Sequence, residues 1–326
     1  MCILIDYTKG EVVSMKAAQL TKFGDSDAIA INSIQKPGVS DGKVLIEVHA
    51  AGVNPVDWKI RSGMMKIPLP ATLGGDFSGV VKEIGMGVTD FKPGDEVYGQ
   101  AAAYAGGGSG SFEEFALAGT GTIAMKPRHI SHIEAGALPL AGASALQALE
   151  SHIKLAKGQH ILIHGGGGGI GSIAIQIAKH IGARVSTTVS DHDIAYAKSL
   201  GADTIIDFHE QKFEEIVKNC DAVLDLVGGD TYRRSFKTLK RGGVIVSLVE
   251  NTDEALMKQF GVTSIYQGTR VTTERLVRLA ELVDKGSLKV HVDKIFPLEK
   301  AGDALAYLEK RHPRGKVVLN ISETVH

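Results

Sequence analysis

Five consecutive glycines at 165–169, followed by Gly171, give the spacing Gly166-x-Gly168-x-x-Gly171. This spacing is typical of a turn that holds the pyrophosphate of a dinucleotide. We expect Gly166 to make the tight turn, Gly168 to let backbone N–H groups approach the phosphates, and Gly171 to let the following helix pack closely. The expected contact surface is Gly166, Gly167, Gly168, Gly169, Ile170 and Gly171.

The elements around the glycines can position such a turn. The run 160–164 is typical of a short buried strand, residues 170–179 have apolar side chains at helical spacing, and 183–189 predict a second strand. Together they form the βαβ unit that the motif requires, and the helix N-terminus would offer unpaired N–H groups and partial positive charge to phosphates. The alternative is a flexible glycine turn without a ligand, because the chain contains 39 glycines and chance matches are easy.

The composition excludes several classes of protein. The 326 residues, 44% of them hydrophobic, predict about two domains with a full core. A net charge of −1 with interspersed signs argues against nucleic acid or an anionic membrane as main partner. The two cysteines, Cys2 and Cys220, exclude a disulfide framework and a multi-cysteine zinc site. No apolar run reaches ~18 residues, and residues 2–5 are too short for a signal-peptide core, so we expect a cytoplasmic protein.

The pattern of predicted helices and strands changes along the chain. We interpret residues 1–14 as an extension, either a disordered leader or the product of an upstream start codon. Residues 15–132 are rich in short strands and turns, which predicts a β-rich, partly open barrel. Residues 133–286 alternate helices and strands, which predicts a doubly wound parallel sheet. The tail, 287–326, returns to strand and is expected to rejoin the first domain, with the ligand between the two domains.

The periodicity also predicts individual elements. The expected strands of the parallel sheet are 161–164, 184–189, 204–207, 222–226 and 244–248. The expected helices are 133–152 with an interruption at Pro139, 191–200, 213–220, 273–285 and 298–310. The expected strands of the tail are 292–296 and 316–320.

Five stretches carry a resemblance that extends from 15 to 321. They are AGVNPVD (51–57), LGGDFSGVV (73–81), FKPGDEVYG (91–99), ALPLAGASA (137–145), and the glycine turn with Gly201-Ala202-Asp203. In order and spacing they resemble the zinc-free quinone oxidoreductase branch of the medium-chain dehydrogenase/reductase superfamily, which includes ζ-crystallin. The resemblance implies an α/β fold, a Rossmann sheet plus a GroES-like catalytic domain, and a homodimer with sheets paired edge to edge.

The resemblance also bears on metal binding. In the zinc alcohol dehydrogenases of the same superfamily, a cysteine and a Gly-His-Glu motif supply ligands. Here Asn54 stands in the cysteine region and Gly74-Gly75-Asp76 replaces the second motif, so the thiolate and imidazole that zinc prefers are missing. We therefore expect no zinc. His129 and His132, three residues apart, leave another metal site open, with surface or core histidines as the alternative.

The cofactor depends on the end of the second strand, where NAD-binding members carry an acidic residue for the ribose 2′-OH. Counting along the strand leads to Ser190, which is compatible with a 2′-phosphate, and the resemblance favours NADPH. Two observations leave NADH open. Asp191 is adjacent, and no Lys or Arg follows within the turn, where a phosphate would prefer one. His192 is the nearby potential cation, or a solvated turn residue.

Further site residues are implied by the resemblance. Asn54 would lie at the nicotinamide end and donate to an oxygen that gains charge, or it caps the turn before Pro55. Ser144 would lie against the cofactor, or it packs a helix. The remaining implied cofactor contacts, at strand ends, are Val227, Ser247, Leu248 and Lys316, the last with a strand-edge lysine as its alternative.

The proton donor is not evident from the sequence. Asp57 and Tyr104 are candidates near the expected ligand, with Trp58 and Lys59, and solvent could serve instead. The glycine-rich segment 106–111 predicts a flexible loop that lines or covers the substrate entrance, or a solvated linker.

The expected function is an NADPH-dependent, zinc-independent reductase. It would transfer hydride to a quinone or to the β-carbon of an α,β-unsaturated carbonyl. One alternative is a trans-2-enoyl-thioester reductase, for which Lys59, Arg61 and Lys66 could supply a basic patch. An alternative of another class is a nucleotide-sensing or RNA-binding protein of the ζ-crystallin type, against which the net charge argues.

Overall fold

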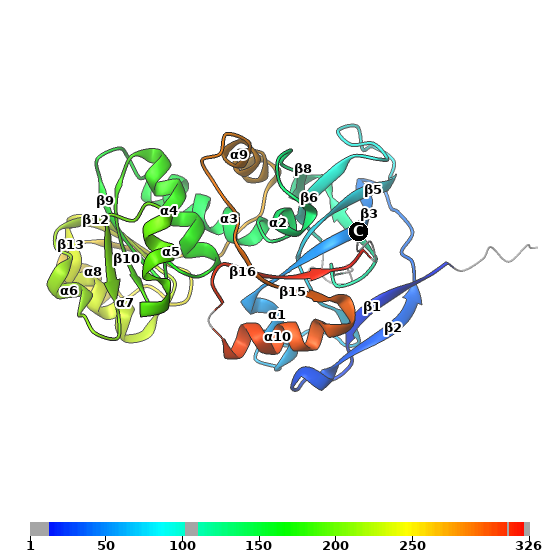
Figure 1. Cartoon of the computed structure of the whole chain (residues 1–326), viewed down its shortest axis with the longest axis horizontal. Helices are drawn as coiled ribbons and strands as arrows, with labels where there is room; N and C mark the ends of the chain where they lie inside the picture. The colour runs from blue at the N-terminus through cyan, green and yellow to red at the C-terminus, as the bar shows by residue number, and fades with distance from the viewer. Residues whose placement is uncertain (1–12, 102–109, 312, 323–326) are drawn as a thin grey trace, which may run out of the picture.

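The structure is a computed structural model that describes residues 13–101, 110–311 and 313–322. Two bodies lie side by side (Figure 1). One is built on a six-stranded sheet and carries the glycine turn, and the other holds a seven-stranded and a three-stranded sheet. The predicted fold class is confirmed: a Rossmann sheet is joined to an antiparallel-rich GroES-like part.

The six-stranded sheet is parallel throughout. Its spatial order, β11-β10-β9-β12-β13-β14, is that of a doubly wound dinucleotide-binding sheet. The strands are β9 (His160–His164), β10 (Arg184–Val189), β11 (Thr204–Asp207), β12 (Cys220–Asp225), β13 (Leu239–Ser247) and β14 (Thr263–Tyr266). The predictions for β10 and β11 are confirmed to the residue. The edge strand β14 was not predicted, because it is short and mixes polar with apolar residues.

Each central strand contributes side chains to two hydrophobic cores, one on each face of the sheet, because alternate side chains point to opposite faces. Leu162 and Val223 pack with residues of α6 (Phe213–Ile216), α7 (Gly229–Ser235) and α8 (Glu254–Phe260). Ile161 and Leu224 pack with residues of α3 (Pro139–Leu146), α4 (Gly169–Ile181) and α9 (Thr273–Asp284). Figure 1 shows α4 and α5 (Ile194–Ser199) on one side of this sheet and α6, α7 and α8 on the other. The strands are therefore apolar on both faces, and the polar groups of the site lie at their ends.

The second body is held together by β16 (Lys316–Asn320), which pairs antiparallel with β3 (Lys43–Val53). The sheet order is β15-β16-β3-β5-β6-β8, with β7 also on β3, and a separate sheet has the order β2-β1-β4. We therefore propose that 287–326 belongs with 15–132 and that 133–286 forms the other domain. The other strands are β1 (Ser14–Leu20), β2 (Ile29–Gln35), β4 (Ala71–Thr72), β5 (Asp76–Ile84), β6 (Glu96–Gln100), β7 (Phe115–Gly119), β8 (Ile123–Met125) and β15 (Val292–Pro297).

The helices differ from the sequence expectation at several ends. The expected helix 213–220 stops at Ile216, because Cys220 already begins β12. The expected helix 133–152 is α2, then α3, then a π-helical segment, Gln147–Ile153. None of α1, α7 and α8 was among the individually predicted helices. The helices are α1 (Pro55–Arg61), α2 (His132–Gly136), α3 (Pro139–Leu146), α4 (Gly169–Ile181), α5 (Ile194–Ser199), α6 (Phe213–Ile216), α7 (Gly229–Ser235), α8 (Glu254–Phe260), α9 (Thr273–Asp284) and α10 (Ala301–Lys310).

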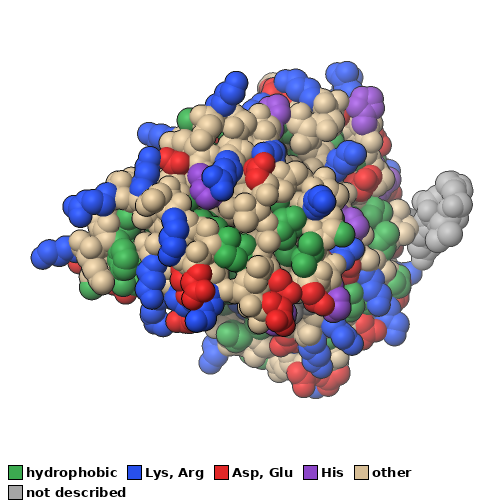
Figure 2. Space-filling view, turned by 60° about the vertical axis from the view of Figure 1, so that its left-hand side comes forward, with side chains coloured by type: hydrophobic (Ala, Val, Ile, Leu, Met, Phe, Trp, Pro, Cys, Tyr) green, Lys and Arg blue, Asp and Glu red, His purple; other side chains and the backbone are tan. Residues whose placement is uncertain are grey.

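The surface carries both signs of charge. On the face in Figure 2, Lys and Arg side chains are interspersed with Asp and Glu, with small apolar groups between them. Within the described ranges, no helix is both long and apolar enough to cross a bilayer. Residues 1–12 of the expected extension lie outside the described residues, and β1 begins at Ser14.

Candidate active site

The glycine turn is shaped by contacts with the protein's own backbone. Its left-handed residue is Gly165, with φ +72°, whereas we expected Gly166 to make the tight turn. Gly166 instead lies against Thr187, where an added Cβ would come within 2.1 Å of the hydroxyl oxygen. Gly171 does bring the helix close, since an added Cβ would lie 2.2 Å from the carbonyl oxygen of Gly165. Glycine is therefore required at these positions by packing alone.

The outer side of the turn fits a phosphate group. Gly168 precedes α4, and an added Cβ would meet the Gly165 carbonyl at an ordinary 3.5 Å. The first intrahelical bond runs from the Ser172 N–H to the Gly168 carbonyl, so the N–H groups of 169–171 belong to the open first turn of a thirteen-residue helix. Such a first turn is a ready site for the pyrophosphate of a dinucleotide.

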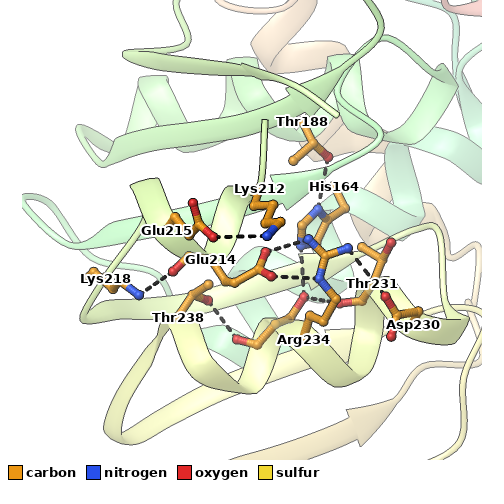
Figure 3. A network of polar contacts seen from close by, with 11 residues as sticks. His164, Thr188, Lys212, Glu214, Glu215, Lys218, Asp230, Thr231, Arg234 and Thr238 are labelled. Atoms are coloured by element: carbon orange, nitrogen blue, oxygen red, sulfur yellow. Dashed lines mark hydrogen bonds and ion pairs between the residues drawn. The ribbon is translucent and has the colours of Figure 1, made fainter. Parts of the chain in front are cut away.

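Uncharged side chains at the end of β9 bond to residues next to the turn, beside the ion pair of Arg234 with Glu214 (Figure 3). His164, at the end of β9, is 2.9 Å from the Thr188 hydroxyl through Nδ1 and 2.9 Å from the Ser235 hydroxyl through Nε2. Thr188 also accepts the N–H of Gly166 at its carbonyl oxygen, at 3.1 Å. Burial lowers the pKa of His164 to about 3, so the ring is uncharged at neutral pH. From the sequence, His164 was predicted only as a strand residue.

The site lies at the junction between the two bodies. On the side of the GroES-like body, buried charged and polar side chains form a connected row. Lys316 Nζ donates to the Val53 carbonyl at 3.0 Å and to Asn54 Oδ1 at 2.5 Å. Asn54 Nδ2 donates to Asp76 Oδ2 at 2.9 Å, and the same oxygen accepts the N–H of Leu140 at 3.0 Å. The Asn54 amide is thus held at both ends, by a cation and by an acid.

Burial and neighbouring charges shift the pKa values of Asp76 and Lys316 in opposite directions. Burial raises the pKa of Asp76, and the neighbouring Lys316 partly lowers it again. Burial lowers the pKa of Lys316, while Asp76 and Asp57 raise it. Lys316 also reaches the glycine turn, because its Cδ lies 2.7 Å from where a Cβ on Gly169 would be. One side chain therefore connects the expected phosphate site with Asn54.

The local sequence explains how Asn54 is presented. Asn54 is the N-cap of α1, and Pro55 occupies the first helical position, where its missing N–H costs nothing. Asp57 accepts the N–H of Asn54 at 2.7 Å through one oxygen and the N–H of Gly74 at 3.2 Å through the other. Asp57, a candidate proton donor from the sequence, is therefore placed as a buried brace for Asn54.

Ser144 and Ser247 are both buried in internal hydrogen bonds. The Ser144 hydroxyl donates to the Leu140 carbonyl at 2.7 Å and contacts the Thr269 hydroxyl at 2.8 Å, which corresponds to the helix-packing alternative. Ser247 Oγ donates to Asp225 Oδ2 at 2.7 Å and accepts the N–H of Glu250 at 3.0 Å. Neither hydroxyl is directed at open space.

Asp225, which was not among the predicted site residues, organises the carboxyl edge of the sheet. It ends β12, is fully buried, and accepts the N–H groups of Val227 at 3.1 Å and Gly228 at 2.9 Å. The N–H of Leu248 bonds its carbonyl oxygen at 3.2 Å. Val227 itself is 56% exposed at this edge. An acid at the end of an apolar strand was the available signal.

Ser190 directly follows β10, as expected, and donates to Asp193 at 3.5 Å. Tyr104 lies outside the described residues, as does 106–109 of the expected entrance loop.

The donor set beside Asn54 does not resemble a zinc site. Among the residues that the structure describes, no group of three or more His, Cys, Asp or Glu could hold a metal. The buried ammonium of Lys316 is 2.5 Å from Asn54 Oδ1. The two residues of the other candidate metal pair, His129 and His132, lie in different surroundings. His132 has both ring nitrogens near polar groups, Ser78 Oγ at 2.7 Å and Glu96 Oε1 at 3.0 Å, and His129 lies in an exposed turn.

Comparisons with known proteins agree with this architecture. Residues 40–128 match the alcohol dehydrogenase GroES-like domain, and 200–319 match a family described as zinc-binding dehydrogenase. The 2-methylene-furan-3-one reductase of Solanum lycopersicum is 37% identical and the NADPH-dependent alkenal/one oxidoreductase, chloroplastic, of Arabidopsis thaliana is 35% identical, each aligned over 94% of this chain and 79% of the relative. The quinone oxidoreductase structure from Coxiella burnetii has a TM-score of 0.88 and 36% identity, over 95% of this chain and all of that one.

These likenesses extend over nearly all of the described chain and include both bodies, the glycine turn and the returning C-terminal strand. The chain is therefore an oxidoreductase that belongs to the zinc-free quinone oxidoreductase branch of the medium-chain dehydrogenase/reductase superfamily.

Proposed function

We propose that this protein uses NADPH to reduce quinones or α,β-unsaturated carbonyls without zinc. One observation carries the proposal: Lys316 touches the glycine turn and also fixes the Asn54 amide. A phosphate-binding turn and an oriented amide are thereby joined in one rigid site. The names of the relatives, which include an NADPH-dependent alkenal/one oxidoreductase and a quinone oxidoreductase, support this cofactor and these substrates.

The chemistry divides between cofactor and chain. Bound NADPH supplies the hydride. The first turn of α4 would hold the pyrophosphate. Asn54 has one amide N–H beyond the bond to Asp76, and Lys316 has one ammonium N–H beyond its two bonds given above. These donors would stabilise the substrate oxygen that gains negative charge. Because Asp57 accepts backbone N–H groups at both oxygens, we propose that water supplies the proton.

Zinc independence is supported by electrostatics. A divalent cation beside Asn54 would lie next to the ammonium of Lys316 in a buried, weakly screened environment. The oxygen that a metal would take, Asn54 Oδ1, already accepts a hydrogen bond from that ammonium.

The test is oxidation of NADPH by purified protein with a quinone, an alkenal and crotonyl-CoA, each repeated with NADH and with EDTA. EDTA-insensitive turnover of the quinone or alkenal with NADPH supports the proposal. Asn54→Ala should lower kcat with little change in the Kd of NADPH. Loss of turnover on EDTA treatment, with recovery on added zinc, would contradict it.

One residue of the basic patch that the enoyl-thioester alternative requires is not available on the surface. Arg61, expected in a basic patch, is buried, and its Nη2 is 2.6 Å from Glu309 Oε2. It cannot serve a solvent-exposed phosphate arm without breaking that pair. Lys59 and Lys66 are left for that role. Preferred turnover of crotonyl-CoA over the alkenal would restore this alternative.

The binding-protein alternative and the assembly are tested separately. Interspersed charge on the face in Figure 2 does not favour a polyanion there. Retention on RNA with a steep salt dependence would support the RNA-binding alternative. We propose a homodimer through the edge strand β14, where Tyr266 is exposed, and light scattering would measure it. The cytoplasmic location stays a prediction that cell fractionation can test.

A further inference from the structure

Three distant segments meet at the glycine turn. The N–H of Gly315 donates to the Gly167 carbonyl at 2.9 Å. The neighbouring Arg314 donates from Nε to Asp193 Oδ1 at 2.8 Å and from Nη2 to the His192 carbonyl at 2.8 Å. An added Cβ on Gly167 would come within 2.6 Å of Asp193 Oδ2, so the Asp193 carboxylate lies directly over the turn.

This is the place where the two nicotinamide dinucleotides differ chemically. In this fold the 2′ position of the adenosine ribose lies at the end of the second strand, here next to Ser190. Ser190 Oγ donates to Asp193 Oδ2 at 3.5 Å, which places that carboxylate at the same point. An acid alone here would accept a ribose 2′-OH and repel a 2′-phosphate.

Asp193 is not alone, because Arg314 neutralises it. The guanidinium is oriented by its two bonds and by the ring of Tyr196, 5.3 Å from Cζ to the centroid. The side chain of Asp193 is 17% exposed, and that of Arg314 is 39% exposed. The two bonds use two of the five N–H groups of the guanidinium, and no described residue is bonded at Nη1. A planar, fixed fork of this kind matches phosphate oxygens.

Other charges nearby are exposed. Asp191 and His192 lie at the same turn with most of their side chains in solvent, 3.5 Å apart. Solvent therefore screens them more than it screens the pair of Asp193 and Arg314.

We propose that Asp193 and Arg314 form a charge-compensated pair that selects the 2′-phosphorylated dinucleotide. Arg314 cancels the charge of Asp193 and turns its remaining N–H groups toward the 2′-phosphate. Without Arg314, the same pocket becomes a site for a ribose 2′-OH. This inference rests on the proposed use of NADPH, and it makes Arg314, from the far end of the chain, the cation that the sequence around Ser190 lacks.

The test uses ligands without a nicotinamide ring, so that no catalysis is needed. The Kd values of 2′,5′-ADP and 5′-AMP are measured by calorimetry on the full chain, together with those of NADPH and NADH. Arg314→Gln should weaken 2′,5′-ADP about 10- to 100-fold, the range for charge-assisted hydrogen bonds to a phosphate. It should leave 5′-AMP unchanged or tighter. Arg184→Gln, at the opposite end of β10, is the matched control and should change neither ligand.

Two more variants separate charge compensation from direct contact. Asp193→Asn should leave 2′,5′-ADP bound at least as tightly and should weaken 5′-AMP. The double variant Asp193→Asn with Arg314→Gln should recover part of the binding of 2′,5′-ADP that the single Arg314 variant loses. No recovery would show that contact alone acts and would overturn the compensation.

The outcomes also separate this inference from the proposed function. If the wild type binds neither dinucleotide, the proposed function fails. If it binds NADPH but Arg314→Gln weakens 2′,5′-ADP and 5′-AMP equally, or neither, the pair is only structural and this inference alone is overturned.

Discussion

The two sides of the junction hold their polar groups by different means. On the Rossmann side, the groups offered to a ligand are backbone N–H groups, supported by the uncharged His164, Thr188 and Ser235. On the GroES-like side, they are side-chain donors held between buried ions, Lys316 and Asp76. Removing a member of the uncharged network leaves neutral buried groups without a partner, at about 1–3 kcal/mol each, whereas removing a buried ion leaves an uncompensated charge. The two sides should therefore respond differently to substitution and to pH.

The largest effect is expected on the ionic side. Lys316→Met leaves the buried Asp76 and Asp57 without their cation, and breaking a buried pair costs about 3–5 kcal/mol. Denaturant unfolding measures this loss. Lys82→Met is the control, because Lys82 pairs with Glu47 at 2.8 Å on the surface and should cost less than about 1 kcal/mol. If both variants lost the same unfolding free energy, the buried charges around Lys316 would stabilise the protein no more than a surface ion pair does.

A smaller loss is expected from overpacking the Rossmann side. Gly171→Ala places a Cβ 2.2 Å from the Gly165 carbonyl and should cost about 1–3 kcal/mol as α4 shifts. Gly168→Ala is the control, since its Cβ meets the nearest atom at 3.5 Å. We expect the control to unfold like the wild type and to bind NADPH more weakly in calorimetry. Normal NADPH binding by Gly168→Ala would argue against a phosphate on the outer side of the turn.

The pH dependence should come from the buried His164 and the part-buried His132, which stay neutral when folded. Burial lowers the pKa of His164 to about 3 and that of His132 to about 4, both below the unfolded value. The unfolded chain therefore binds protons first, so stability is full above about pH 6.5 and falls as pH decreases below it. The slope is up to about 1.4 kcal/mol per pH unit for each group.

Unfolding measured at several pH values would test this, with His164→Gln as the comparison. The variant should lose the share of the slope that His164 contributes and keep the share of His132. An unchanged slope would show that His164 is not the titrating group.

The smallest effect is expected at Ser144. Ser144→Ala removes hydroxyl bonds to Leu140 and Thr269 and should cost about 1 kcal/mol, with the Kd of NADPH unchanged. Thermal unfolding and calorimetry measure the two quantities. A clearly weaker NADPH complex would return Ser144 to the cofactor site that the family resemblance implies.

Much of the fold could be predicted because its signals are local. The apolar β-branched runs of β9, β10 and β11 and the glycines between β9 and α4 are read directly from neighbouring residues. The errors are also local in origin. The helix α6 was predicted too long because its apolar spacing continues into β12, and the edge strand β14 has too little apolar character to be recognised.

The sequence by itself determined the strands of the parallel sheet and the glycine turn, because each depends on residues close together in the chain. It also determined the family, because five short motifs follow one another in a recognisable order and spacing. The tertiary structure decided which side chains meet at that turn. Lys316 reaches Asn54 across 262 positions, and Arg314 reaches Asp193 across 121. Both contacts exist because β16 pairs with β3 and because Gly315 bonds Gly167, pairings that no local pattern around Asn54 or Ser190 encodes. The charges that tune the site are therefore set by the return of the C-terminal strand.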